Sequence, residues 1–492
     1  MGIRFNVFFL FSLFSLFSIN AQKITIKILD SLSNKPIPFA SIIFSNNEGL
    51  ISNEKGEFLL FDEHFRVNDS IIISYIGYEA RKLNLDETIN RVIRLKQKPI
   101  MLNEVIMTNK KYSAKEIIYL VKKNIILNYP DNYTHARLFH GINNFQKIKK
   151  LKINNFKSSI PKLNKSLIDS LLILLPMKNK NSMEVLTFFD KDLYNENHKI
   201  NLIKARETYG KDDFIESFQK RIKKALEKNL KSDSYYKIKS GLFKRDIDLQ
   251  SLEFNVDSTN SDFLKKKKHD AYKRDLKKKN EFAENRKKNL NFLYNTLFYK
   301  KNSDFNMIEK PNRYEFKLLE MSYLGNNLAY VISFKPKRNE KYYGTLYVNS
   351  NDYALMRFDF QNKESLFKFK LLGISVDNYK KSGRMIFYKT ENRYLLRYLY
   401  VDSYTNIIFN RPLKFIEKNK NVQGRRKQNQ ISMDIDASFT NKSINEVRVL
   451  SEKIISKDSF NNIKEKNIVL PKFISEFKTD FWKGYESDKF IE

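Results

Sequence analysis

Residues 23–95 alternate short apolar segments with turns. The segments rich in β-branched and aromatic residues are 23–29, 40–44, 58–61, 70–75, 79–83 and 91–95, and Ser, Asn, Pro and Gly gather between them. Short strands at a spacing of about 8–12 residues, separated by turns, predict a β-sandwich. Gly56 lies in one of these turns, where we expect it to supply a backbone angle that a Cβ would oppose.

The pattern becomes helical after residue 112. Ser113 and Glu116 have the spacing of a capping box, and apolar residues continue to Ile125 before Pro130 ends the predicted helix. Residues 212–231 repeat apolar side chains every fourth position, opposite Lys and Arg, and 261–297 continue similarly. Solvated helix faces explain their lysine clusters, and contact with an anionic membrane surface is the functional alternative.

From residue 313 apolar and polar residues alternate with a period of two. Segments 313–319, 328–334, 342–348, 353–360, 384–388, 394–400 and 431–439 have this period, with short turns between several of them. This pattern predicts an antiparallel meander. The fold class is therefore α+β and mostly β: an N-terminal seven-stranded sandwich, a helical middle, and a C-terminal antiparallel, half-barrel-like sheet.

These patterns divide the chain into six parts. They are an export signal at 1–21, the sandwich at 22–98, a linker strand and helix at 99–145, a helical basic region at 146–305, the meander at 306–450, and a charged tail at 451–492 with the only Trp.

Three motifs follow one another in the sandwich: residues 35–42 (KPIPFASI), 52–58 (SNEKGEF) and 74–79 (SYIGYE). Together they resemble the carboxypeptidase regulatory-like domain, a transthyretin-like sandwich of Gram-negative envelope proteins. The motif residues are Gly56, Phe58, Gly77 and Tyr78. Phe39 departs from the family pattern, which usually has a small residue there. The resemblance implies an accessory fold without peptidase chemistry; an unrelated sandwich with the same turns is the alternative.

Two later segments also carry resemblances. Residues 102–107 (LNEVIM) resemble the strand that follows such domains in TonB-dependent receptors and related envelope proteins, but no Gly-rich plug follows here. Residues 343–358 resemble a hairpin of an uncharacterised envelope family. More distantly, they are similar to the curved half-barrel of periplasmic lipoprotein carriers.

The N-terminus has the pattern of an export signal. Arg4 precedes an apolar run at residues 5–19, and Ala21 and Gln22 flank the expected cleavage point. A run of about fifteen residues is short for a spanning helix and suits a signal peptide, although a retained anchor is the alternative. We therefore expect an exported protein, periplasmic or associated with the outer membrane.

The charge and the cysteine content limit the classes of partner that we expect. The 492 residues carry a formal charge of +34, but the basic residues are dispersed and no nucleic-acid module is recognisable, so we expect no nucleic-acid partner. An envelope protein, lipid or glycan is the expected partner, with peripheral contact to an anionic membrane surface. Because there is no Cys, disulfides, a lipobox and Cys-ligated metals are excluded.

No motif indicates catalysis. The five histidines are His64, His135, His140, His198 and His269, and none has zinc-peptidase spacing. His135 and His140 are five residues apart on a predicted strand, so they face opposite sides. Nucleophile-elbow, Walker and dinucleotide motifs are missing. We therefore expect a non-enzyme with no catalytic, cofactor or metal residues.

Three functions remain open from the sequence. The first, which we favour, is an envelope binding or structural protein whose half-barrel holds a lipid, glycan or partner strand. The second is an outer-membrane β-barrel or TonB-dependent-receptor relative, although Lys and Arg occupy both faces of the predicted strands. The third is an envelope hydrolase whose acid–base pair the sequence hides.

Overall fold

A computed structural model describes most of residues 24–482. The larger gaps are 45–48, 61–69, 85–91, 99–111, 210–233, 249–260 and 475–478, and residues 1–23 and 483–492 also lie outside the described residues. The predicted signal with Ala21 and Gln22, the strand at 102–107 and the helix at 212–231 therefore lie outside them. The described residues divide into two compact units, one built mainly from residues 1–106 and one mainly from 107–479.

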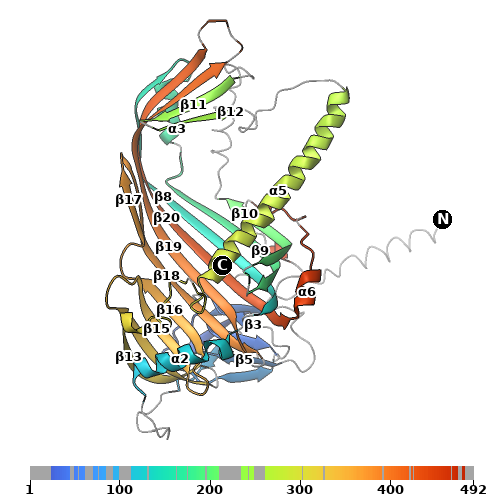
Figure 1. The fold of residues 1–492 in the computed structure, drawn as a ribbon, viewed down its shortest axis with the longest axis vertical. Helices are drawn as coiled ribbons and strands as arrows, with labels where there is room; N and C mark the ends of the chain where they lie inside the picture. The colour runs from blue at the N-terminus through green and yellow to red at the C-terminus, as the bar shows by residue number, and fades with distance from the viewer. Residues whose placement is uncertain are drawn as a thin grey trace, which may run out of the picture. The chain divides into compact units, whose positions relative to one another are not determined.

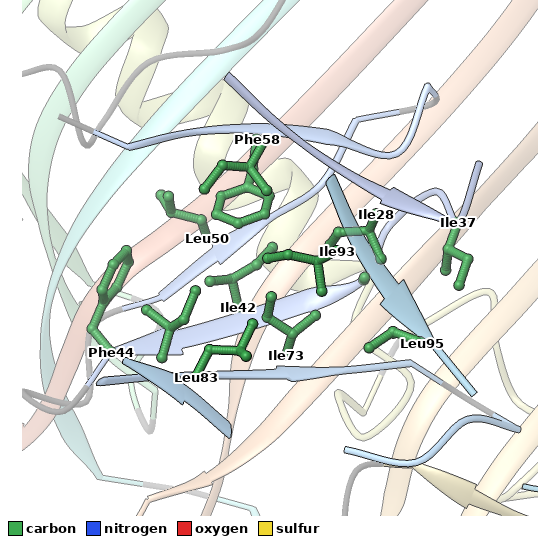
Figure 2. Packing of buried hydrophobic residues seen from close by; sticks show 13 residues of the cluster. Ile28, Ile37, Ile42, Phe44, Leu50, Phe58, Ile73, Leu83, Ile93 and Leu95 are labelled. Carbon is green, nitrogen blue, oxygen red and sulfur yellow. The ribbon is translucent and has the colours of Figure 1, made fainter. Parts of the chain in front are cut away.

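The first unit contains the predicted sandwich. One sheet has the order β4-β1-β7 and the other β3-β2-β5-β6. The strands are β1 (Ile24–Asp30), β2 (Ser41–Phe44), β3 (Gly49–Ile51), β4 (Glu57–Leu60), β5 (Ser70–Ser74), β6 (Arg81–Asn84) and β7 (Val92–Leu95). Alternate apolar residues from both sheets point inward, and Figure 2 shows Ile28, Ile42, Phe58, Ile73 and Ile93 packed between them. The seven-stranded sandwich is confirmed.

The second unit is built on one large sheet, whose main path is β13-β14-β15-β16-β18-β19-β20-β8-β9-β10-β21. Its strands are β8 (Tyr133–Ser158), β9 (Lys178–Asp192), β10 (His198–Tyr209), β13 (Tyr314–Leu324), β14 (Asn327–Pro336), β15 (Tyr342–Asn349), β16 (Leu355–Asn362), β18 (Ile374–Thr390), β19 (Arg393–Asn419), β20 (Lys427–Ile455) and β21 (Lys472–Phe473). Figure 1 shows the long strands β8, β19 and β20 side by side. The path is open at both ends, and the predicted antiparallel sheet is confirmed.

Three shorter strands extend this sheet. β17 (Phe367–Leu371) pairs with β18, while β11 (Ser234–Ser240) pairs with β19 and with β12 (Phe243–Asp248). The middle of the chain is thus only partly helical. The sequence pattern missed β9 to β12. The bulge between Leu202 and Lys204 interrupts the alternation in β10, and β11 and β12 are only 7 and 6 residues long, so no long segment of period two stands out.

The helices of the second unit are α2 (Ala114–Asn128), α3 (Lys165–Ile173), α5 (Ser261–Asn295) and α6 (Lys457–Asn462). The capping box of α2 is present: Glu116 N donates to Ser113 Oγ at 3.3 Å, and Ser113 N donates to the Glu116 carboxylate at 2.7 Å. None of the helices in the described residues is long and apolar enough to cross a membrane.

Gly56 gives a prediction for the sandwich. Its φ is +74°, and an added Cβ would lie 2.7 Å from the Ile28 carbonyl oxygen and 3.0 Å from the Ile37 nitrogen. We expect Gly56→Ala to lower the free energy of unfolding by more than the about 1–2 kcal/mol that a left-handed backbone costs alone. Calorimetry of the full chain measures this.

Gly424→Ala is the matched control. Gly424 has a φ of +91°, but nothing lies within 4 Å of the position that an added Cβ would take, so this variant carries only the backbone cost. Equal losses for the two variants would show that the close carbonyl contact at Gly56 has no energetic effect.

Candidate functional site

Helix α5 lies against one face of the large sheet, close to β9 and β10 (Figure 1). Its buried side chains recur at helical spacing and continue just past its end: Ala283, Leu290, Leu293, Tyr294, Leu297 and Phe298. The Tyr294 ring packs 5.4 Å from the ring of Phe189 on β9. We call this side of the sheet the helix face; by strand alternation and register, it also carries Val401 and Thr405 of β19.

An ion pair is buried on the helix face. Lys191 Nζ lies 2.5 Å from Glu452 Oε1, and the two side chains are only 3% and 4% exposed. The same Nζ lies 4.1 Å from the Tyr294 ring centroid. Burial lowers the pKa of Lys191, while Glu452 acts in the opposite direction. The pair therefore joins β9 to β20 beneath α5 and neutralises a charge that burial alone would disfavour.

His140 lies on the same face. Burial and, to a smaller extent, the nearby Arg286 guanidinium of α5 lower the pKa of this imidazole to about 3, while Asn445 acts in the opposite direction. The ring is therefore neutral near pH 7. The side chain does not act as an acid–base group near neutrality.

A cavity of about 310 Å³ lies between α5 and the sheet. Phe292, Leu293, Phe360 and Val401 form apolar parts of its wall, and Asn289, Thr296, Asn378, Ser403, Thr405 and Asn445 contribute amides and hydroxyls. Such a mixture of apolar wall and a few polar groups is typical of small-molecule sites.

Lys381 also lines this cavity. Burial lowers the pKa of its amine, and the carboxylate of Asp304 partly opposes that shift. Asp304 itself pairs with Lys341 at 2.9 Å, whereas Lys381 forms no ion pair with the described residues. A half-desolvated amine at a cavity wall favours an anionic ligand group, because the anion would replace lost hydration.

The helix face becomes apolar beyond the cavity. Residues directly opposite one another on adjacent strands point the same way, and two such rows cross β17, β18, β19, β20 and β8. The first row is Phe369, Val376, Ile407, Phe439 and Ile148; the second is Leu371, Ile374, Phe409, Ala437 and Leu151. We call these ten residues the apolar rows. All are half-buried or exposed except Ala437, and Phe369 is 40% exposed.

The four motif residues predicted from sequence lie in the sandwich, not at this cavity. Phe58 belongs to its core, and Gly56 and Gly77 both have positive φ. Tyr78 Oη donates to Asp30 Oδ2 at 2.7 Å; burial and this carboxylate raise the pKa of Tyr78 to about 12. Phe39 has a φ of +60°, which gives a physical reason for a small residue at that position in the family.

The described histidines do not converge. His135 Nδ1 shares a 2.5 Å hydrogen bond with Asp190 Oδ1, whereas His140 lies beside Arg286 and Asn445. Among the described residues, no group of three or more His, Asp or Glu side chains could hold a metal ion. Sequence reasoning missed Lys191, Lys381 and Glu452. Only the fold brings them to one face, and the sequence distance between Lys191 and Glu452 is 261 residues.

Comparison with known proteins assigns the N-terminal unit. Residues 24–107 match the family model of the CarboxypepD_reg-like domain, which reaches past the expected boundary at residue 98. This part of the chain is therefore a carboxypeptidase regulatory-like domain, a non-catalytic module, as the three motifs predicted. A search of curated proteins finds no match.

Solved structures give only distant likenesses. A LolA superfamily protein from Nitrosomonas europaea has 8% identity and a TM-score of 0.15, over 71% of this chain and 98% of that chain. The MucA/MucB complex of Pseudomonas aeruginosa has 7% identity and a TM-score of 0.16, over 70% and 99%. A membrane-associated protein of unknown function from Bacteroides fragilis has 8% identity and a TM-score of 0.13, over 88% and 99%. TM-scores this low do not establish a shared fold.

The buried ion pair gives a prediction. We expect Lys191→Met to lower the free energy of unfolding by about 3–5 kcal/mol, because it leaves the Glu452 carboxylate buried without its partner. The double variant Lys191→Met, Glu452→Met should recover most of that loss, since it removes both charges. Denaturant unfolding followed by circular dichroism measures both.

The exposed pair Lys341–Asp304 is the control, with side chains 49% and 52% exposed. Lys341→Met should lower the free energy of unfolding by less than about 1 kcal/mol. A Lys191→Met loss no larger than this would contradict the role given to burial.

Proposed function

We propose that this protein is an exported, non-enzymatic envelope protein that binds an anionic amphiphile on the helix face of its large sheet. The observation that carries the proposal is the continuity of the cavity with the apolar rows. Asn378 and Thr405 line the cavity, and Val376 and Ile407 lie two residues further along the same two strands, on the same face.

The two regions suit the two parts of one molecule. Lys381, amides and hydroxyls at the cavity can receive a carboxylate or phosphate. The apolar rows can cover an acyl chain, and each methylene removed from water contributes about 0.8 kcal/mol. Glycans lack a long apolar part, so the rows favour a lipid among the three partner classes expected from sequence.

Export is supported by the sequence of residues 1–22, and a regulatory-like domain is compatible with an envelope protein. In this proposal the sandwich is the accessory module and the second unit holds the ligand. Neither the accessory role nor ligand binding requires catalysis.

Ile407 and Ile408 provide a matched test of the apolar rows. They are adjacent on β19, so their side chains point to opposite faces, and only Ile407 belongs to the rows. We expect Ile407→Asn to weaken binding of a fluorescent long-chain fatty acid about tenfold, because a polar amide replaces an apolar contact. Titration below the aggregation threshold of the fatty acid measures the dissociation constant.

Ile408→Asn should leave that constant unchanged, since Ile408 lies on the other face and is already 45% exposed. If both variants bind like the parent, or both lose binding equally, the apolar rows are not the acyl site.

Lys381 gives a separate test of the polar end. We expect the parent protein to bind a long-chain fatty acid at least about tenfold more tightly than the alcohol of equal length, because a charged hydrogen bond to Lys381 adds to the affinity. Lys381→Met should bind the two ligands equally. Competition titrations compare them.

Lys442→Met is the control, because Lys442 does not line the cavity and its amine lies over Tyr404 on the opposite face. It should keep the preference for the acid. An unchanged preference in Lys381→Met would place the head group elsewhere.

A further inference from the structure

The face opposite α5 carries a row of alternating cations and aromatic rings. Register places Lys380 (β18) opposite Tyr404 (β19), Tyr404 opposite Lys442 (β20), Lys442 opposite Phe145 (β8), and Phe145 opposite Lys180 (β9). Strands lie about 4.8 Å apart, so this five-strand row is about 19 Å wide.

The amines lie against the rings between them. Lys380 and Lys442 Nζ are 5.3 and 5.5 Å from the Tyr404 centroid. Lys442 and Lys180 Nζ are 5.9 and 5.7 Å from that of Phe145. Each distance is within the range of a cation–π interaction, which holds the amines beside the rings. Lys380 and Lys442 form no ion pair with the described residues.

The next row adds two more cations. Lys147 and Lys178 lie directly opposite each other on β8 and β9, and both are exposed. Like charges in this position destabilise a sheet, and neither lysine forms an ion pair with any described residue. Exposed Ile408 lies on the same face, on β19. We call the five lysines 147, 178, 180, 380 and 442 the basic face.

We propose that the basic face docks on the surface of an anionic phospholipid bilayer. Five cations spread over a sheet face match the distributed negative charge of such a surface. The rings of Tyr404 and Phe145 and the side chain of Ile408 suit the boundary between headgroups and acyl chains, where aromatic residues are favoured. A soluble polyanion would offer no apolar layer for these three side chains.

The opposed pair Lys147–Lys178 strengthens the argument. Its repulsion is a cost to the free protein, and anionic headgroups would relieve it on docking. The pair should therefore have opposite effects on stability and on membrane binding, which a purely structural role would not give.

Flotation of the full chain with vesicles tests the proposal. We expect binding to phosphatidylcholine vesicles that contain phosphatidylglycerol, and loss of this added binding at about 1 M salt, where the screening length falls to about 3 Å. Vesicles of phosphatidylcholine alone give the baseline of binding that does not depend on lipid charge.

The triple variant Lys180→Gln, Lys380→Gln, Lys442→Gln should bind the anionic vesicles about 100-fold more weakly, since each lysine near the surface contributes about fivefold. The control replaces three exposed lysines of β13, β14 and the residue after β14, Lys317→Gln, Lys335→Gln, Lys337→Gln. It makes the same change in net charge, and its binding should fall less than tenfold.

The second variant, Lys147→Gln with Lys178→Gln, should raise the melting temperature and weaken vesicle binding together. Three results would overturn the proposal: equal losses in the triple variant and its control, binding to neutral vesicles as strong as to anionic ones, or a Lys147→Gln, Lys178→Gln variant that is stabilised and still binds fully. Strong binding to a soluble polyanion such as heparin with none to anionic vesicles would also overturn it.

Discussion

The register of β18, β19, β20 and β8 is the constraint on which the second unit depends. Side chains alternate between faces along each strand, so one register decides at once which residues line the cavity, form the apolar rows and form the basic face. Ile407 and Ile408 are chemically identical neighbours, yet register gives one to the apolar rows and the other to the face with lysines. A slip of one residue would exchange these surfaces.

The pairing itself resists such a slip. β19 and β20 pair from Tyr398 to Lys418, and β20 and β8 pair along nearly their whole length, with bulges at fixed places. Bulges pin a register because each inserts one unpaired residue at a defined position. The buried pair Lys191–Glu452 also opposes a change of register, because displacing β9 or β20 would leave a charge buried without its partner.

How much of this the sequence could predict differs between the two units. The sandwich depends on short-range signals: turn residues, alternating isoleucines, and Gly56, whose positive φ could be anticipated from its place in a turn. The helix after Ser113 is likewise predicted by short-range signals. The cavity depends on pairings between distant segments: Asn445 and Lys381 reach one site only through the register of β18, β19 and β20. Period-two alternation can predict that such strands exist, but not which residues of two strands stand opposite each other.

The same strands carry an apolar face on one side of the sheet and a charged face on the other. Exposed strand edges and apolar patches promote aggregation, and lysines are the common protection. β17 shows the arrangement in five residues: Phe367, Phe369 and Leu371 point to the helix face, while Lys368 and Lys370 alternate with them and point to the other. Because each apolar residue of β17 has a cationic neighbour one position away, the sheet gains its charge on one side without losing apolar surface on the other. Lysines placed in this way contribute to the high net charge of the chain, which is +34.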